Sequence, residues 1–252
     1  MDQFGEAQSD KLITPFQRLQ NDLAHVIADT AAGQKLPSEP KLAKQLGVSR
    51  ATLREAMRSF EGQGVIRRRQ GVGTFVVGPG QVFETGLEIL ESIETLAEKM
   101  KIDVKMGELV VEKIEANEKY AKKLGVALKT PLVSVSRVIL TEERPVAFLI
   151  DVLPESVLAS EDLKAGFSGS VLDRLIESKN YSLSKSKTII HAVAASSSIA
   201  RSLEIQRGDV LLYFEASLYD EEGSVIDYSH SYFLPGYFRF QVMRSIGGTF
   251  KL

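Results

Sequence analysis

Apolar residues in the first third of the chain recur every three or four positions, which is the spacing of amphipathic helices. One such pattern predicts a helix from Pro15 to about Ala32. A second helix is expected to begin at Ser38 and a third at Ser49, because serine is a favoured N-cap residue. Between them Gly47 indicates a tight turn. Two short helices joined in this way predict a helix-turn-helix.

After the third helix the pattern changes to that of a short β-hairpin. One strand begins at residues 65–66, residues 70–73 form a glycine-rich tip, and residues 74–77 return. The sequence Gly-Pro-Gly at 78–80 indicates a linker, and residues 87–99 have the pattern of a helical connector. The hairpin therefore closes a first domain, which we place at residues 12–77.

The remainder of the chain alternates apolar and polar residues over longer segments, as half-buried strands do. Strands are predicted near residues 107–114, 132–142, 146–153, 185–195, 210–220, 224–234 and 237–244. Helices are predicted near residues 117–124, 169–179 and 196–204. Hairpin turns at 142–145 and 221–223 predict an antiparallel α+β domain. We place this second domain at residues 95–246, after a linker and connecting helix at 78–94.

Composition is that of a globular protein and argues against several classes of function. The 252 residues are 44% hydrophobic and 25% charged. No apolar run reaches the roughly 18 residues of a membrane span, and no secretory signal is found, so a cytoplasmic location is expected. Cysteine is absent and only three histidines occur, so no cofactor, metal site or cysteine nucleophile is expected.

Charge is distributed unevenly between the two predicted domains. Residues 1–77 contain 11 Lys/Arg and 8 Asp/Glu, a net charge of +3. The other 175 residues contain 20 and 25, a net charge of −5. A basic module joined to an acidic one is typical of a nucleic-acid-binding domain with a partner domain. Charge alone leaves chance unevenness open.

The third predicted helix carries the candidate DNA-binding side chains. Arg50 and Arg54 are four residues apart, so they share one helix face. They lie in the N-terminal half of the helix, which in helix-turn-helix proteins reaches the base edges. Ser49 and Thr52 carry hydroxyls suited to phosphates. The alternative is that these arginines and Arg58 form a solvated face.

The hairpin would form a basic wing beside this helix. Gly71 and Gly73 let its backbone approach a DNA groove, and Gln70 can donate a hydrogen bond to a base or a phosphate. Three arginines at residues 67–69 add positive charge. Alternation along a strand prevents all three from facing DNA.

Residues 37–77 resemble the winged helix-turn-helix of the GntR family of bacterial transcription regulators. The matching motifs are Leu36-Pro37-Ser38-Glu39, Leu46-Gly47-Val48-Ser49-Arg50, Thr52-Leu53-Arg54-Glu55-Ala56, Arg69-Gln70-Gly71 and Gly73-Thr74-Phe75. The resemblance implies DNA contacts by Ser49, Arg50, Thr52, Arg54, Gln70 and Gly71. Where the family has an arginine that touches the DNA backbone, this chain has Pro40, and Lys41 is expected to take part of that role. Ser38, Lys41 and Gly73 complete the predicted DNA-binding set.

Residues 95–245 resemble the UTRA effector domain of the HutC-type branch of that family, which shares its fold with chorismate lyase. The motifs are Pro131-Leu132-Val133, Ser136-Arg137-Val138, Arg144-Pro145-Val146, Gly208-Asp209-Val210-Leu211 and Tyr237-Phe238-Arg239-Phe240. The resemblance implies an α+β fold with an antiparallel sheet and a small metabolite bound in a cleft of that sheet.

Some members of this branch hold a sugar phosphate with two arginines spaced Arg-x-Arg, which strand alternation places on one face. This chain has Arg137 but Ile139 at the second position. A ligand with one acidic group, or an uncharged or more apolar one, therefore competes with a sugar phosphate. The resemblance also points to Ser170 and Asp227, and Phe233 begins a segment that departs from the family pattern.

The predicted effector-binding set is Arg137, Asp151, Ser170, Asp227 and Phe233. All of these except Phe233 have a structural alternative. Arg137 can pair with Asp151 across a hairpin, Ser170 can be a plain helix cap, and Asp227 can be a surface residue.

Together these observations predict a homodimeric transcription regulator, a repressor, that binds pseudopalindromic operator DNA under the control of a small-molecule effector. Two alternatives are an enzyme with a lyase-like domain and a DNA-architectural protein without an effector. The absence of cysteine and of any nucleophile–base spacing argues against an enzyme, and no catalytic residue is predicted. The arginine face argues for sequence-specific binding.

Overall fold

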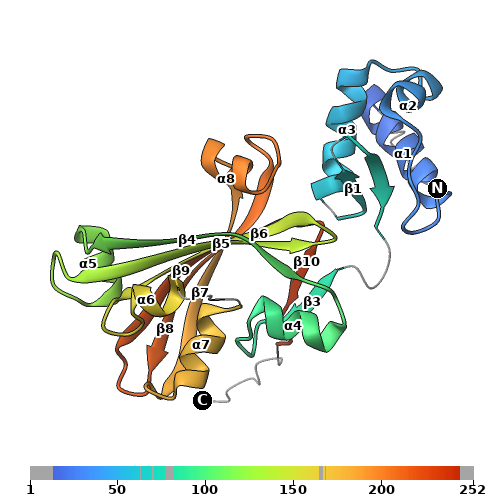
Figure 1. The fold of residues 1–252 in the computed structure, drawn as a ribbon. Helices are drawn as coiled ribbons and strands as arrows, with labels where there is room; N and C mark the ends of the chain where they lie inside the picture. The colour runs from blue at the N-terminus through green and yellow to red at the C-terminus, as the bar shows by residue number, and fades with distance from the viewer. Residues whose placement is uncertain are drawn as a thin grey trace, which may run out of the picture. The chain divides into compact units, whose positions relative to one another are not determined.

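The computed structural model describes residues 14–62, 64–69, 71–77, 82–164, 167 and 169–244. The chain divides into two compact units, and the division falls between Pro79 and Gly80. The N-terminal unit is mainly helical, whereas the C-terminal unit is built on a large sheet (Figure 1). Each unit has its own buried apolar core.

Three helices and a hairpin make up the N-terminal unit. In chain order they are α1 (Pro15–Ala28), α2 (Glu39–Gln45), α3 (Arg50–Gly62), β1 (Ile66–Arg69) and β2 (Gly73–Val76). The two strands pair antiparallel. The predicted helix-turn-helix and wing are therefore confirmed. The buried core of this unit consists of Leu19, Leu23, Ile27, Leu36, Leu42, Ala43, Leu53, Ala56, Met57, Ile66 and Val76.

The first helix is shorter than its apolar pattern predicts. It ends at Ala28 rather than near Ala32. Residues 33–36 pair with β2 instead, and the backbone N–H of Gly33 donates to the carbonyl of Val76 at 2.8 Å. The hydrogen bonds of this third, irregular strand replace those of a longer helix.

A six-stranded antiparallel sheet forms the centre of the C-terminal unit. Across the sheet the order is β4 (Lys105–Glu115), β5 (Pro131–Thr141), β6 (Arg144–Pro154), β9 (Val225–Phe233), β8 (Val210–Asp220) and β7 (Leu183–Ala194). Each of these strands was expected from its alternating pattern, and the antiparallel α+β fold is confirmed. Left-handed backbone at Glu142 and Glu143 makes the tight turn between β5 and β6.

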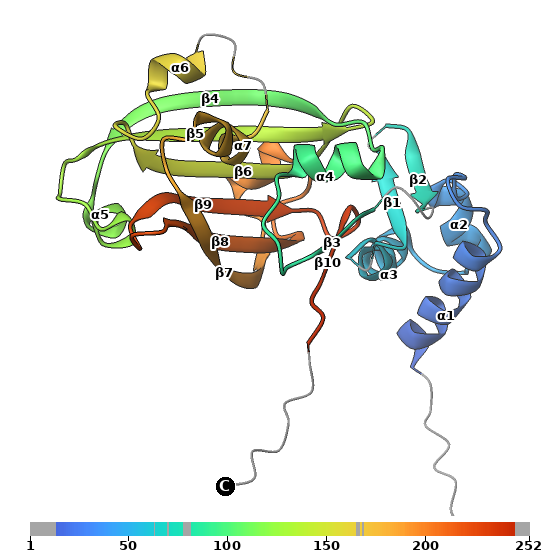
Figure 2. The same ribbon diagram turned by 90° about the horizontal axis from the view of Figure 1, so that it is seen from below.

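Helices cover both faces of this sheet (Figures 1 and 2). One face, called the α4 face below, is covered by α4 (Ile93–Met100), α6 (Ser160–Lys164) and α7 (Val171–Ser178). The other face is covered by α5 (Glu118–Leu124) and α8 (Ser197–Ser202). Within the described residues no helix is long and apolar enough to cross a membrane.

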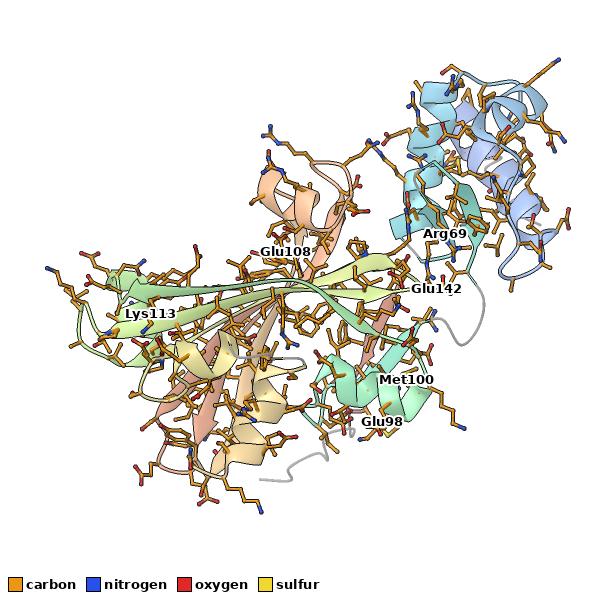
Figure 3. All side chains as sticks on the ribbon, in the orientation of Figure 1. Arg69, Glu98, Met100, Glu108, Lys113 and Glu142 are labelled. Atoms are coloured by element: carbon orange, nitrogen blue, oxygen red, sulfur yellow. The ribbon has the colours of Figure 1, made fainter. Side chains whose placement is uncertain are left out.

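The short helix α6 is attached to the sheet by charge. The side chain of Lys113 on β4 (Figure 3) places its Nζ 2.5 Å from Glu155 and 2.9 Å from Glu161. Lys113 and Glu161 are exposed, so solvent screens these pairs and their contribution to stability is small. Five residues are too few for a helical period, which explains why α6 has no signal in the sequence pattern.

The predicted connector contains a strand that the sequence pattern does not reveal. β3 (Phe83–Gly86) pairs in parallel with β10 (Phe238–Gln241). The helix α4 therefore begins only at Ile93, after its N-cap Ser92, and not at Leu87. Because the paired segments lie near opposite ends of this unit's sequence, no local period shows the pairing.

Candidate DNA-binding surface and effector site

The start of α3 presents its polar side chains to solvent. Oγ of Ser49 accepts a hydrogen bond from the backbone N–H of Thr52 at 3.1 Å, so Ser49 caps the helix as predicted. Arg50, Thr52 and Arg54 are exposed, whereas Leu53 is fully buried. No ion pair of Arg50 or Arg54 is found in the part of the chain that the structure describes.

The turn before α3 depends on Gly47, whose φ of +66° is in the left-handed region that favours glycine. Buried Leu42 and Ala43 pack α2 onto the core beneath α3. Ser38 and Lys41 are exposed at the start of α2. Ser38 occupies the N-cap position, but its side chain makes no capping hydrogen bond. Both side chains are thus accessible to a partner.

The wing exposes less positive charge than three consecutive arginines suggest. Arg67 is 5% exposed, and Arg68 pairs with Glu39 at 2.7 Å. The guanidinium of Arg69 lies 4.7 Å from the ring centroid of Phe75. Because Ile66 faces the core of the unit, alternation along β1 places Arg67 on the opposite face of the hairpin, together with Phe75. The exposed cations of this unit are therefore concentrated on the helices.

Two glycines shape the tip of the wing. Gly71 is exposed with φ of +72°, and Gly73 has φ of +142°. The far end of the exposed Lys35 side chain occupies the space of a Cβ on Gly73, but that flexible chain can move, so the backbone geometry is what favours glycine here. Gln70 lies outside the described residues.

Four of the five predicted effector residues lie on the α4 face of the sheet. Arg137 is on β5, Asp151 is on β6, and Asp227 and Phe233 are on β9. Asp151 lies opposite Ser229, two residues from Asp227, so both carboxylates project from the same face. The fold thus brings together side chains that are up to 96 residues apart in the sequence, from Arg137 to Phe233.

Arg137 is buried among acceptors. Its guanidinium forms an ion pair with Glu94 of α4, and its Nη1 donates to the carbonyl of Gly169 at 2.5 Å. Its Nε lies 3.9 Å from Oδ2 of Asp151. The pairing with Asp151 is therefore present but longer than a hydrogen bond. Sequence analysis did not identify Glu94 as a residue of this cluster. The one feature that could have indicated it is its position in the first turn of a capped helix.

Burial makes these carboxylates difficult to ionise. Burial raises the pKa of Asp151 to about 6, against the opposing effect of the Arg137 charge. Burial, followed by the charge of Asp151, raises the pKa of Asp227 well above its usual range. Asp227 is 6% exposed, so the alternative of a surface residue is wrong.

Several polar atoms of this cluster have no hydrogen-bond partner among the described residues. They are Oε2 of Glu94, Nε of Arg137, Oδ2 of Asp151 and Oδ1 of Asp227. A buried polar atom left without a partner costs about 1–3 kcal/mol, so such atoms are uncommon unless another group satisfies them.

Ser170 and Ser92 cap two helices that meet on the α4 face. Oγ of Ser170 accepts from the backbone N–H of Asp173 at 3.3 Å, and Oγ of Ser92 donates to the Asp173 carboxylate at 2.6 Å. Both serines are buried. The role of Ser170 as a helix cap is confirmed, and its contact with a ligand stays a prediction. Ser92 had no place in the predicted site.

Phe233 lies in an aromatic core at one end of this face. Its ring centroid is 4.8 to 5.1 Å from those of Phe214, Phe238 and Phe240. Ile139 is 1% exposed in the same core. An arginine at position 139 would bury a second guanidinium there, so isoleucine fits the packing of this chain.

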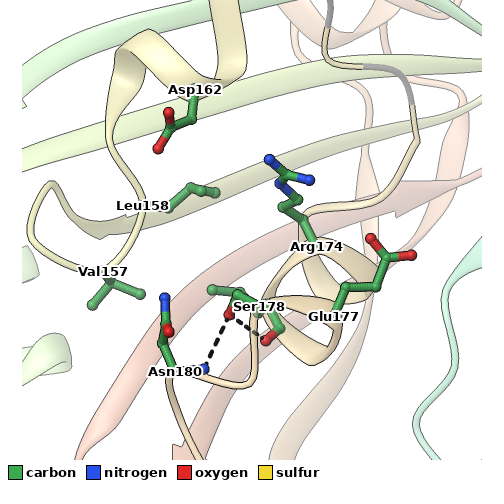
Figure 4. Close-up of a pocket in the computed structure, with 8 residues that line it drawn as sticks. Val157, Leu158, Asp162, Arg174, Glu177, Ser178 and Asn180 are labelled. Carbon is green, nitrogen blue, oxygen red and sulfur yellow. Dashed lines mark hydrogen bonds between the residues drawn. The ribbon is translucent and has the colours of Figure 1, made fainter.

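A separate surface cavity of about 290 Å³ lies beside α7 (Figure 4). Its lining residues are Val157, Leu158, Asp162, Arg174, Leu175, Glu177, Ser178 and Asn180. None of the predicted effector residues lines it, so it is distinct from the cluster around Arg137.

The opposite face of the sheet carries another polar cluster, in which the groups are paired. The hydroxyl of Tyr213 lies 2.5 Å from Nδ1 of His230, and the hydroxyl of Tyr228 donates to Glu215 at 2.8 Å. Glu215 also forms an ion pair with Lys123 of α5. Burial lowers the pKa of His230 to about 4, so the imidazole is neutral at physiological pH. This cluster is a satisfied structural network.

A winged helix-turn-helix joined to an α+β sheet domain with a buried polar cluster defines a class of protein, the ligand-responsive DNA-binding regulators. The family model "Bacterial regulatory proteins, gntR family" matches residues 16–76, and the model "UTRA domain" matches residues 100–239. The chain belongs to the GntR family of bacterial regulators, in the branch that carries a UTRA domain.

Relatives with names and solved structures agree with this assignment. The HTH-type transcriptional repressor NagR of Bacillus subtilis is 28% identical over 199 residues, which are 78% of this chain and 79% of NagR. A probable fructoselysine utilization operon transcriptional repressor of Escherichia coli is 28% identical over 134 residues, 51% of each chain. The crystal structure of PhnF from Mycobacterium smegmatis has a TM-score of 0.63 at 21% identity and covers 91% of this chain and 100% of PhnF.

Family membership decides between the three functions that the sequence left open. The protein is a DNA-binding transcription regulator controlled by a small molecule in its UTRA domain, and it is not an enzyme. The likeness to PhnF concerns the fold alone.

Proposed function

We propose that this regulator is a repressor that binds a pseudopalindromic operator as a homodimer and leaves it when a metabolite binds the UTRA domain. The observation that carries the proposal is the capped, exposed start of α3, where Arg50 and Arg54 project from a helix whose other side is buried. Two such helices in a dimer suit half-sites about one DNA turn apart.

In this proposal the N-terminal unit divides its contacts between bases and phosphates. Arg50 and Arg54 donate to guanine O6 and N7, and each bidentate contact is worth about 1–3 kcal/mol of discrimination. Ser49 and Thr52 bind phosphate together with the helix N-terminus. Ser38 and Lys41 bind the backbone at α2, and Gln70, Gly71 and Gly73 place the wing against a groove.

The direction of regulation rests on the relatives. NagR and the fructoselysine operon regulator are both described as transcriptional repressors, which supports repression here. The effector would bind the predicted set Arg137, Asp151, Ser170, Asp227 and Phe233. Binding would favour one of two states that differ in operator affinity, with the linker near residues 78–86 as the hinge.

The first test is selection of sequences bound by the full-length protein from a random DNA pool, followed by affinity measurement at fixed salt. We expect a two-fold symmetric consensus and a specific Kd at least about a thousandfold below that for random DNA. Arg54→Ala should reduce this difference by roughly 5- to 150-fold. Binding that is equal for all sequences would overturn the proposal, and light scattering of the free protein tests the dimer.

The second test concerns control by a metabolite. A small molecule that stabilises the full-length protein should lower its affinity for the selected operator, and Arg137→Ala should abolish both effects. Stabilisation without any change in operator affinity would contradict the coupling between the two domains.

A further inference from the structure

The four charged side chains around position 137 carry more negative than positive charge. Arg137 contributes one guanidinium, whereas Glu94, Asp151 and Asp227 contribute three carboxylic acids. Arg137 and Asp227 are 4% and 6% exposed, so bulk solvent screens their charges weakly. When all four groups are ionised, their formal charge is −2, and protonation of Asp227, whose pKa is raised by burial, leaves it at −1. Such a site repels an anion.

The guanidinium is already engaged by the protein. Nη1 of Arg137 donates to both Glu94 and the carbonyl of Gly169. A phosphate would have to displace Glu94 and then lie near two further carboxylates, Asp151 and Asp227. Ile139, at the second position of the Arg-x-Arg pair, supplies no further positive charge. The chemistry of this site is therefore unfavourable to a phosphate dianion.

The site contains carboxylate oxygens that can accept hydrogen bonds from a ligand. Oε2 of Glu94, Oδ2 of Asp151 and Oδ1 of Asp227 have no hydrogen-bond partner among the described residues. An ammonium group carries up to three N–H donors and no acceptor, so it complements these oxygens in hydrogen bonding as well as in charge. The neighbouring Ser229 on the same face is only partly buried, so polar groups extend from the carboxylates toward solvent.

We propose, on the basis of the effector site assigned above, that Asp151 and Asp227 bind a cationic amino group of the effector, with Glu94 as a further acceptor. Arg137 then serves as an internal counter-charge that holds the carboxylates in place. The effector is an amine rather than a phosphate ester. The raised pKa values of Asp151 and Asp227 agree with this assignment, because burial disfavours their charged forms by more than the Arg137 charge offsets.

The test is a thermal unfolding series on the full-length protein with matched compounds at equal ionic strength. Glucamine, sorbitol and sorbitol 6-phosphate share one carbon skeleton and differ in charge, and methylammonium and inorganic phosphate serve as minimal probes. We expect the two amines to raise the unfolding midpoint by roughly 2 °C or more, and the alcohol and both phosphates to leave it unchanged.

Three isosteric variants test whether the amine that raises the unfolding midpoint binds at Asp151 and Asp227. Asp227→Asn and Asp151→Asn should each abolish the rise in midpoint caused by glucamine. Asp162→Asn removes a carboxylate of the separate surface cavity and should leave the rise unchanged. If one asparagine variant does not fold, Glu94→Gln supplies the same comparison from α4, where the expected result is a glucamine shift at least halved.

Other outcomes overturn the amine assignment. A midpoint raised by sorbitol 6-phosphate and dependent on Arg137 would show a phosphate site and leave the proposed metabolite control intact. A midpoint raised by sorbitol alone, or by none of the five compounds, would reject the amine assignment as well. Operator affinity of the untreated protein, measured in parallel, separates these results from a failure of the proposed function.

Discussion

Arginines at two places in this molecule have opposite surroundings. Arg50 and Arg54 of α3 are exposed, with no ion pair among the described residues. Arg137 of β5 is buried, paired with Glu94 and close to Asp151. The same side chain is thus available to DNA phosphates and bases in one domain and neutralised internally in the other. An arginine in a predicted site therefore indicates an anion site only when its own protein does not already supply the counter-charge.

The strongest way to challenge this contrast is to remove the buried guanidinium. Arg137→Met would leave the carboxylates around it without a counter-charge, and removing one partner of a buried pair costs about 3–5 kcal/mol. We expect a loss of that size in the free energy of unfolding, measured by circular dichroism in urea. Arg174→Met, at an exposed position of the surface cavity, is the control and should change stability by less than about 0.5 kcal/mol. Equal stability of the two variants would contradict the counter-charge role.

The second prediction concerns pH. The unfolded chain loses the Asp151 proton near the ordinary value of 3.8, whereas burial raises the pKa in the folded protein to about 6. The folded state therefore binds the proton more tightly, and wild-type stability decreases as the pH rises through this interval. Asp151→Asn should be more stable than wild type above pH 6, by on the order of 2–3 kcal/mol.

This gain should shrink as the pH falls from 6 towards 4 and vanish only below the unfolded value of 3.8, where both states of the wild type carry the proton. Thermal unfolding of wild type and Asp151→Asn across that range measures it. A difference that does not vary with pH would mean that the effect comes from packing and not from the buried charge. Asp162→Asn again provides an exposed comparison.

On the DNA-binding side, Arg54→Ala should weaken operator binding by about 1–3 kcal/mol, roughly 5- to 150-fold in Kd. Arg58 lies one turn further along α3 and pairs with Glu55 at 3.3 Å, so Arg58→Ala should have a smaller effect. Fluorescence anisotropy with a labelled operator at one salt concentration compares the two. A larger loss in Arg58→Ala would show that the base-reading end of α3 is assigned incorrectly.

The smallest expected effect distinguishes two serines at helix starts. Ser49→Ala removes a capping hydrogen bond from α3 and should destabilise the N-terminal unit by about 1 kcal/mol. Ser38→Ala at the start of α2 removes no such bond and should be nearly neutral for stability. Differential scanning calorimetry of the full chain resolves the two cases, and equal losses would argue against the observed capping geometry.

Much of the fold could be predicted from the sequence because its signals are local. Ser49, Gly47 and the apolar stripe of α3 define the helix-turn-helix within a few residues of one another. The six strands of the main sheet alternate clearly enough to be located within a few positions. By contrast, β3 pairs with β10 across almost the whole C-terminal unit, and α1 ends early because residues 33–36 pair with β2.

The candidate effector site likewise depends on long-range contacts that the sequence pattern does not show. Arg137 and Asp227 were singled out by their resemblance to a family motif, but the sequence did not reveal that Glu94 pairs with that arginine. Glu94 lies 43 residues before Arg137 in a segment expected to connect the domains. Its role arises only when α4 packs on the sheet.

The spacing of residues along the chain was thus sufficient to predict the class of protein. A helix face, a cap and a turn are each determined by residues within one or two helical turns of each other. The charge of the effector site was decided by tertiary structure. Long-range packing determined which carboxylates surround Arg137, and the low dielectric of the interior determined how strongly they affect it. An arginine that the sequence marked as an anion ligand is, in the folded protein, already neutralised by its own domain.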